Sequence, residues 1–114
     1  MYKIFIDGQA GTTGLQIHER LQDRADLEIL AISDAERKDP KTKRQIIEAA
    51  DIVILCLPDD AARETVQLAP SNKARFIDAS TAHRIHPDWV YGLPELSNTQ
   101  RSQIQSARFV SNPG

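Results

Sequence analysis

Three short apolar runs, each followed by turn-forming or helix-starting residues, constrain the fold of this chain more than any other feature. They cover residues 2–6, 27–32 and 52–57. Their length and near-continuous hydrophobicity are typical of strands buried on both faces, as in a parallel sheet. Two weaker runs follow at residues 75–77 and 108–110, so we expect five strands in all.

The segments that connect these runs carry helical signals. Such signals are found over residues 12–24, 42–50, 60–69 and 97–107. Two of the segments open with capping-box patterns, in which Thr42 and Ser97 would be the N-caps. Because strand and helix alternate, we predict an α/β fold with a Rossmann-type, doubly wound, mainly parallel sheet and helices on both faces. Residues 81–96 fit neither period, and a long irregular connection is usually functional.

Composition and charge limit the partners of the chain. At 114 residues there is room for one domain, and 40% apolar content is ordinary for a globular chain. A formal net charge of −2 argues against a nucleic-acid or membrane-surface binder. No apolar run is long enough to cross a bilayer, and the first residues lack the layout of a secretory signal. The single cysteine, Cys56, fits a reducing compartment, so we expect a cytoplasmic protein.

A glycine-rich loop lies between the first expected strand and the first expected helix. Gly8, Gly11 and Gly14 follow a GxxGxxG spacing, with Ala10 in place of the middle glycine of the commoner GxGxxG form. Such glycines let the backbone turn tightly against a pyrophosphate, which the helix N-terminus then holds. The placement predicts a dinucleotide site, against the plainer interpretation of turn and packing glycines. Asp7 complicates this prediction, because a carboxylate beside a pyrophosphate is repulsive unless it points away or is hydrogen-bonded.

The end of the second strand bears on the choice of cofactor. Asp34 lies about 20 residues beyond the glycines, where an acidic residue often bonds the ribose 2′-hydroxyl of NAD. Ser33, Arg37 and Lys38 are close to it in sequence, and a hydroxyl with two cations suits the additional 2′-phosphate of NADP. The plainer interpretation of the cations is a solvated cluster with neighbouring acids. From the residues alone, NADP is favoured over NAD.

Further stretches complete a family pattern. LCLPDDAA ends the third strand, IDASTAHR ends the fourth, YGLPEL falls in the irregular segment, and SNPG covers residues 111–114. Together with IDGQAGTTGLQI, these motifs resemble the N-terminal half of N-acetyl-γ-glutamyl-phosphate reductases, in particular their shorter, type 2 branch. The resemblance covers essentially the whole chain. Aspartate-semialdehyde dehydrogenases share the glycine loop and the general plan, but we do not expect YGLPEL or SNPG there.

The resemblance implies roles for individual residues. Gly8, Gly11, Thr12, Thr13 and Gly14 would form the loop that binds the pyrophosphate of NADP. The 2′-phosphate would be bound by Ser33, Arg37 and Lys38. The wall of the cleft would include Cys56, Leu57 and Pro58, and Ser80 would lie near the nicotinamide. Three residues would lie near the substrate or the active centre: Arg84, Glu95 and Asn112. Arg84 also has a chemical case of its own, because an acyl phosphate needs a cation, although a structural salt bridge is as good an interpretation.

The resemblance also implies a reaction. In that family Asn-Pro-Gly precedes a cysteine, whose thiolate attacks the acyl phosphate of N-acetyl-γ-glutamyl phosphate and expels phosphate, leaving a thioester. NADPH delivers a hydride to the thioester carbon, and collapse of the thiohemiacetal releases the semialdehyde of arginine biosynthesis and the cysteine. We therefore expect residues 1–114 to form an NADP(H)-binding domain that ends just before the catalytic-cysteine domain and has no turnover alone. The intact enzyme would act on this small molecule as a homo-oligomer.

Other reactive side chains have plainer interpretations. Cys56 lies in an apolar run, where cysteine usually behaves as a small hydrophobe, so we do not expect it to be a nucleophile. His83, His86 and Asp88 do not form a strong zinc pattern, and we expect no metal. Trp89 is more typical of a small core beneath a long loop than of a stacking platform.

Two alternative functions stay open at this point. One is a stand-alone nucleotide-binding or regulatory module that ends naturally at Gly114, and the other is a relative of the aspartate-semialdehyde dehydrogenases. The strand and turn expected near Gly114 argue against the module, because the ligand cleft would have only half of its wall.

Overall fold

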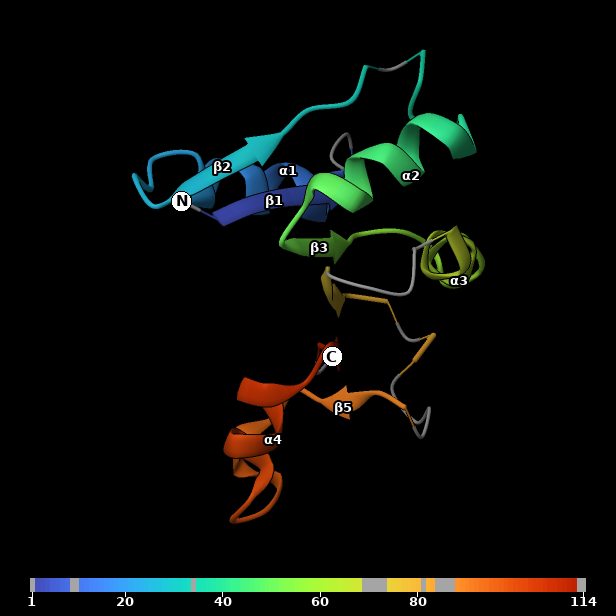
Figure 1. The fold of residues 1–114 in the computed structure, drawn as a ribbon. Helices are drawn as coiled ribbons and strands as arrows, with labels where there is room; N and C mark the ends of the chain where they lie inside the picture. The colour runs from blue at the N-terminus through green and yellow to red at the C-terminus, as the bar shows by residue number, and fades with distance from the viewer. Residues whose placement is uncertain are drawn as a thin grey trace.

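The computed structural model describes residues 2–8, 11–33, 35–68, 74–80, 82–83 and 88–112. Within these residues the chain forms a six-stranded sheet in the order β2-β1-β3-β4-β6-β5, and each neighbouring pair is parallel (Figure 1). The strands are β1 (Tyr2–Asp7), β2 (Leu27–Leu30), β3 (Ile52–Leu55), β4 (Arg75–Asp78), β5 (Val90–Tyr91) and β6 (Phe109–Ser111). The predicted Rossmann-type, doubly wound sheet is confirmed.

Helices lie on both faces of this sheet. They are α1 (Thr12–Leu21), α2 (Pro40–Ala49), α3 (Asp59–Leu68) and α4 (Gln100–Ser106), with a short 3₁₀ helix, η1 (Pro94–Leu96). In Figure 1, α1 lies behind β1 and β2, whereas α2 passes in front. Phe5 of β1 and Val53 of β3 share one buried core with Ile47 of α2 and Ala62 of α3. These two helices therefore cover the same face of the sheet.

The chain changes direction between β1 and β3, which are neighbours in the sheet. From β1 it passes through α1 to β2 on one side, and from β3 it passes through α3 to β4 on the other. In open α/β sheets, ligands bind beyond the carboxyl ends of the strands at such a switch point. The topology therefore directs attention to Gly8, after β1, and to Cys56, after β3.

The predicted N-cap of the second helix was wrong. α2 begins at Pro40 and not at Thr42, and its N-cap is Asp39, whose carboxylate accepts a hydrogen bond from the Lys41 N–H at 3.2 Å. An aspartate that accepts from the first turn, followed by proline at the first helical position, is itself a strong start signal. This pair starts the helix two residues ahead of the capping box, and Thr42 donates its hydroxyl to Asp39 at 2.8 Å.

The last helix, by contrast, begins later than predicted. A capping box needs the Gln100 side chain to reach back to Ser97, but this buried side chain donates instead to the Tyr91 carbonyl. Thr99 therefore occupies the N-cap position of α4, without a side-chain hydrogen bond. Tyr91 belongs to β5, a strand of two residues inside the segment predicted to be irregular, and two residues are too few to show a period.

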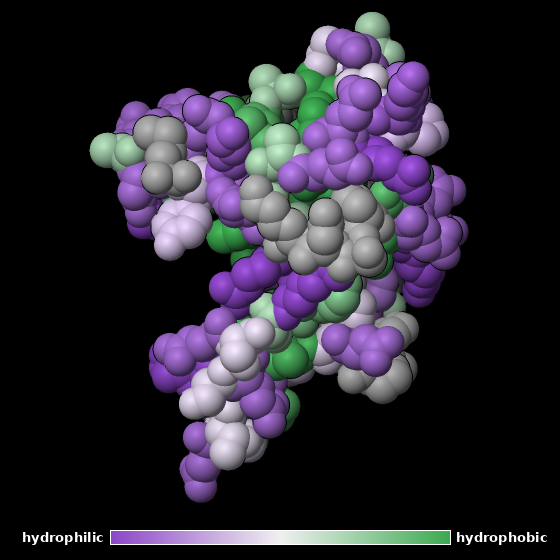
Figure 2. Space-filling view, in the orientation of Figure 1, coloured by the Kyte–Doolittle hydropathy of each residue, from purple (hydrophilic) through white to green (hydrophobic). Residues whose placement is uncertain are grey.

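Polar side chains dominate the face of the molecule that Figure 2 draws. Figure 2 shows hydrophilic residues over most of this face of the molecule, with apolar residues gathered near its centre. Among the residues that the structure describes, no helix is long and apolar enough to span a membrane. The same residues contain no group of three or more histidine, cysteine or acidic side chains placed to hold a metal ion.

Candidate functional site

The backbone turns sharply at Gly8, at the carboxyl end of β1. Its φ of 91° lies in the left-handed region that favours glycine. A Cβ atom at this position would lie 2.2 Å from the carbonyl oxygen of Cys56, which follows β3. The Gly8 carbonyl accepts a hydrogen bond from the Gly11 N–H at 3.0 Å, which closes the turn. Both the conformation and the close approach therefore require glycine at position 8.

Helix α1 begins directly after this turn. Gly11 is its N-cap and makes no side-chain cap hydrogen bond, and the first turn contains no acidic residue. Thr12 and Thr13 are exposed there, whereas Gly14 is buried in the packing of the helix. The N–H groups and the positive dipole end of such a helix can hold an anion.

A cavity of about 650 Å³ opens at the same edge of the sheet, a size that suits a small ligand. Its walls come from the end of β1 and from α1, α2, α3 and the segments after β2 and β3. The apolar part of its lining includes Ile32, Leu57 and Leu68. The charged part consists of Arg37, Lys38, Lys43, Asp7 and Glu64. The structure thus brings four of the predicted cofactor residues to one cavity: Gly8, Arg37, Lys38 and Leu57.

Asp7 lines this cavity, and its carboxylate is paired with two helices. Its Oδ2 accepts from Thr65 Oγ1 of α3 at 2.7 Å and lies 3.1 Å from Lys43 Nζ of α2. The carboxylate beside the glycine turn is therefore hydrogen-bonded and ion-paired. Sequence reasoning missed Lys43 and Thr65, because nothing in their own segments distinguishes them from other polar residues of a helix.

Two of the three residues predicted to bind the 2′-phosphate line the cavity, and the third does not. Arg37 and Lys38 are exposed and line the cavity. Ser33 is not among the lining residues: its hydroxyl donates to Glu36 Oε1 at 2.9 Å and accepts from the Glu36 N–H at 3.3 Å. These bonds close a local turn after β2. Asp34, the residue that would favour NAD, lies outside the described residues.

Cys56 and its neighbours follow β3 beside the cavity. Leu57 lines it, and Pro58 is exposed. Cys56 is half-buried, and burial first, then the carboxylates of Asp7 and Asp78, raise the pKa of its thiol to about 11. A thiol with this pKa stays protonated near neutral pH, whereas the thiolate is the nucleophilic form. A thiol in this environment is a poor nucleophile near neutral pH.

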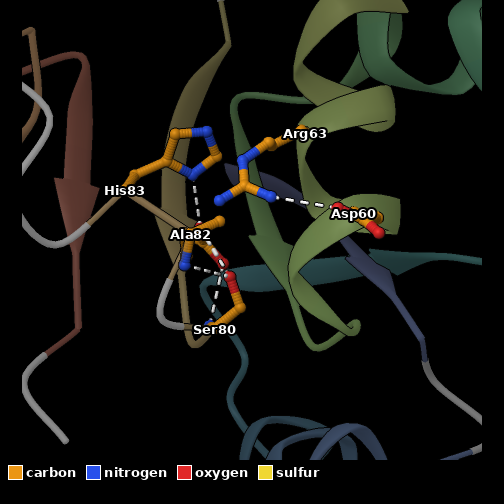
Figure 3. A network of polar contacts seen from close by, with 6 residues as sticks. Asp60, Arg63, Ser80, Ala82 and His83 are labelled. Atoms are coloured by element: carbon orange, nitrogen blue, oxygen red, sulfur yellow. Dashed lines mark hydrogen bonds and ion pairs between the residues drawn. The ribbon is translucent and has the colours of Figure 1, made fainter.

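A second polar cluster lies at the carboxyl end of β4. Asp78 is fully buried, and its carboxylate accepts from the N–H and the hydroxyl of Ser80, both at 2.9 Å. The same carboxylate contacts Nδ1 of His83 at 2.5 Å. Figure 3 shows Ser80, Ala82 and His83 converging, and the Ser80 hydroxyl accepts from the Ala82 N–H at 3.1 Å. Ser80 is therefore held in place by its own short loop.

Trp89 closes this cluster on the side of the core. The His83 ring stacks on its indole with 4.1 Å between the ring centroids, and the Phe109 ring lies 5.0 Å away on a tilt. Trp89 is buried with the central apolar core and not in a separate small core beneath the loop. Sequence reasoning considered His83 as a weak metal-ligand candidate and did not find its partner Asp78, although an aspartate that directly ends an apolar strand was the available signal.

The three predicted substrate residues fall in different places. Asn112 is exposed directly after β6, and its N–H donates to the Asp78 carbonyl at 2.8 Å, so it lies beside the cluster that holds Ser80. Glu95 is exposed on η1. Arg84 lies outside the described residues.

Comparisons with known proteins agree with this architecture. The family model of the semialdehyde dehydrogenase, NAD binding domain, matches residues 36–107. The N-acetyl-gamma-glutamyl-phosphate reductases of Brucella ovis and Brucella canis are each 57% identical to this chain over 113 residues, 98% of its length. The chain spans only 36% of the length of these curated relatives.

Solved structures of two enzymes resemble the whole fold. Aspartate semialdehyde dehydrogenase II from Vibrio cholerae, complexed with ASA, superposes with a TM-score of 0.68 at 16% identity, over 100% of this chain and 42% of that one. The aspartate semialdehyde dehydrogenase of Francisella tularensis gives a TM-score of 0.70 at 18% identity, over 100% of this chain and 36% of that one. At such low identity the likeness shows the fold alone.

Proposed function

Since the chain belongs to the semialdehyde dehydrogenase NAD-binding domain family, we propose that it is the NADP(H)-binding domain of an N-acetyl-γ-glutamyl-phosphate reductase. The intact enzyme would reduce N-acetyl-γ-glutamyl phosphate to the semialdehyde in arginine biosynthesis. The 57% identity to reductases of that name supports this choice over aspartate semialdehyde dehydrogenase, at 16% and 18%. The free, half-buried Cys56 fits a reducing compartment, so the proposal places the enzyme in the cytoplasm.

The cavity beside Gly8 is the observation that carries the proposal. It lies at the switch point between β1 and β3, where a dinucleotide binds in folds of this class. A backbone without Cβ at position 8 and an uncapped helix start at Gly11 suit a pyrophosphate. Ile32 and Leu57 offer apolar surface for the adenine ring.

Two cations favour NADP(H) over NAD(H). Arg37 and Lys38 line the cavity after β2, on the side where the adenosine ribose would lie, and a guanidinium with an ammonium suits a phosphate at the 2′ position. Ser33, whose hydroxyl is bonded to Glu36, would contribute by fixing the turn that carries the two cations.

The contribution of this chain to the reaction is binding and orientation. When bound, the cofactor supplies a hydride. Gly8 and the start of α1 would hold the pyrophosphate, and Arg37 and Lys38 would hold the ribose phosphate. Asp78 fixes Ser80 at the end of β4, and Ser80 would lie near the nicotinamide. Because the pKa of Cys56 is raised to about 11, we assign the nucleophile to a cysteine of the intact enzyme other than this one.

Calorimetric titration with NADP⁺ and with NAD⁺ tests the proposal. We expect NADP⁺ to bind about tenfold more tightly or better, because one phosphate gains charge-assisted hydrogen bonds. Arg37→Ala combined with Lys38→Ala should remove this preference and leave NAD⁺ affinity nearly unchanged. Arg101→Ala, an exposed arginine on α4, is the matched control. Equal affinity for both dinucleotides would overturn the choice of NADP, and a folded protein that binds neither would overturn the dinucleotide site.

A further inference from the structure

The position of Asp7 poses a problem for any phosphorylated ligand. Its carboxylate lines the cavity, directly before Gly8, where a Cβ atom would collide with the Cys56 carbonyl. A buried carboxylate is screened little by solvent, so an uncompensated charge there would repel a nearby phosphate. An unpaired buried carboxylate would also be costly in the folded protein itself.

Lys43 compensates this charge at short range. Its Nζ lies 3.1 Å from Asp7 Oδ2, and the two side chains are only 14% and 7% exposed. Thr65 Oγ1 donates to the same oxygen at 2.7 Å, so the carboxylate is held from two helices. All three side chains line the cavity. With this pair cancelled, the remaining charged lining is Arg37, Lys38 and Glu64, which favours an anion.

We infer that Lys43 is a positioning residue that sets the anion affinity of the cavity by neutralising Asp7. This inference rests on the proposed nucleotide site and deepens it. Lys43 acts through Asp7 and through the field in the cavity, whereas Arg37 and Lys38 provide the direct phosphate contacts. The pair therefore controls how tightly any phosphorylated adenosine is held, in addition to tying α2 to β1.

A purely structural role for Lys43 has different consequences. If the pair only holds α2 against β1, its loss would lower the stability of the protein and weaken charged and uncharged ligands alike. If Lys43 sets the field, its loss would weaken anions alone. Removal of Asp7 by itself would then strengthen anion binding, because the lysine charge would no longer be cancelled.

Protein-observed NMR titrations with two probes separate these cases. Adenosine 2′,5′-bisphosphate carries the phosphates, and adenosine carries none. For Lys43→Met we expect the dissociation constant of the bisphosphate to rise about tenfold, and for Asp7→Asn we expect it to fall by several fold, with adenosine unchanged in both. Lys41→Met removes an exposed lysine of the same helix and should change neither probe.

The double variant Asp7→Asn with Lys43→Met keeps the test decisive if Lys43→Met alone does not fold. Compared with Asp7→Asn, the double variant lacks only the lysine charge, and it should bind the bisphosphate about tenfold more weakly. Equal affinities of these two variants, or parallel losses for adenosine and the bisphosphate, would overturn the inference while leaving the nucleotide site intact. A wild-type protein that binds neither probe would overturn the proposed function as well.

Discussion

Asp7 and Asp78 end the two strands that flank β3, and both are buried, yet their carboxylates are balanced in different ways. Asp7 is held by Thr65 of α3 and Lys43 of α2, which lie far along the chain. Asp78 is held by Ser80 and His83, two and five residues away. One cluster therefore depends on how helices pack against the sheet, and the other forms within a single loop.

The two clusters, at the same edge of the sheet, therefore have different roles. The Asp7 cluster joins β1 to α2 and α3 around the cavity, so its charge is coupled to whatever occupies that cavity. The Asp78 cluster fixes the shape of the chain after β4 and turns the His83 ring onto Trp89. We expect variants of Asp78 to act mainly on stability, and variants around Asp7 to act mainly on ligand binding.

Replacing Asp78 should have the largest effect on stability. Asp78→Ala leaves the donors of Ser80 and His83 without their acceptor in the interior. A buried donor without a partner costs about 1–3 kcal/mol, so we expect the lost hydrogen bonds together to cost about 3–5 kcal/mol. Urea denaturation followed by circular dichroism measures the loss. Asp60→Ala, whose side chain is 99% exposed, should leave the midpoint unchanged. A midpoint for Asp78→Ala within error of the wild type would show that the cluster is not structural.

Thr65→Val should lower the stability less, because Asp7 keeps its ion pair with Lys43. The change removes one hydrogen bond to a buried carboxylate at nearly constant volume, for a loss of about 2 kcal/mol in the free energy of unfolding. The same denaturation experiment measures it, with Thr13→Val, exposed on α1, as the matched control. A loss as large as that of Asp78→Ala would remove the contrast between the two clusters.

Cys56 reports on both aspartates, since it follows the strand between them. With a pKa of about 11, about one thiol in a thousand is ionised at pH 8, so alkylation by iodoacetamide should be slow until strongly basic pH. Asp7→Asn should lower this pKa, because the Asp7 charge helps to raise it, yet leave it above 9.0, because burial is the larger cause. An unchanged pH–rate profile, matching that of Asp60→Asn, would show that Asp7 and Cys56 are not electrostatically coupled.

The raised pKa of the Cys56 thiol should make the stability of the protein depend on pH. Its ordinary pKa is 9.0 and its pKa in the folded protein is about 11, so between these values the unfolded chain loses the proton while the folded chain keeps it. Stability should therefore fall as the pH rises from 9 to 11, and Cys56→Ala should lack this part of the decline. Thermal melts of both proteins across this range provide the measurement. Parallel curves would contradict the raised pKa.

Local signals were enough to predict most of the fold. The apolar runs placed β1, β3 and β4 within one or two residues, and the glycine spacing placed the turn between β1 and α1. Boundaries were wrong where a distant group competes for a side chain, as with Gln100, whose amide bonds the Tyr91 carbonyl instead of capping α4. The two-residue strand β5 was missed because its pairing with β6 is a tertiary contact.

The candidate site was only partly predictable, because some of its contacts join segments that lie far apart in the sequence. Gly8 could be identified because backbone conformation is a local property. The pairing of Asp7 with Lys43 and Thr65 could not, since it depends on α2 and α3 packing on the same face. Ser33 was missed although its contact is local: its hydroxyl was assigned to a phosphate, but in the structure it is bonded to Glu36, three residues further along the chain.

The parallel sheet also has a consequence for the synthesis of the chain on the ribosome. No strand pair among the described residues can close as a hairpin, and β1 is flanked on its second side only when Ile52 arrives to pair with Ile4. At about 5–20 residues per second, the intervening chain takes from about 2 to about 10 seconds to synthesise. For that time the apolar first strand, an interior strand of the finished sheet, has an open edge. We therefore expect residues 2–7 to be the part of the nascent protein that a chaperone shields first.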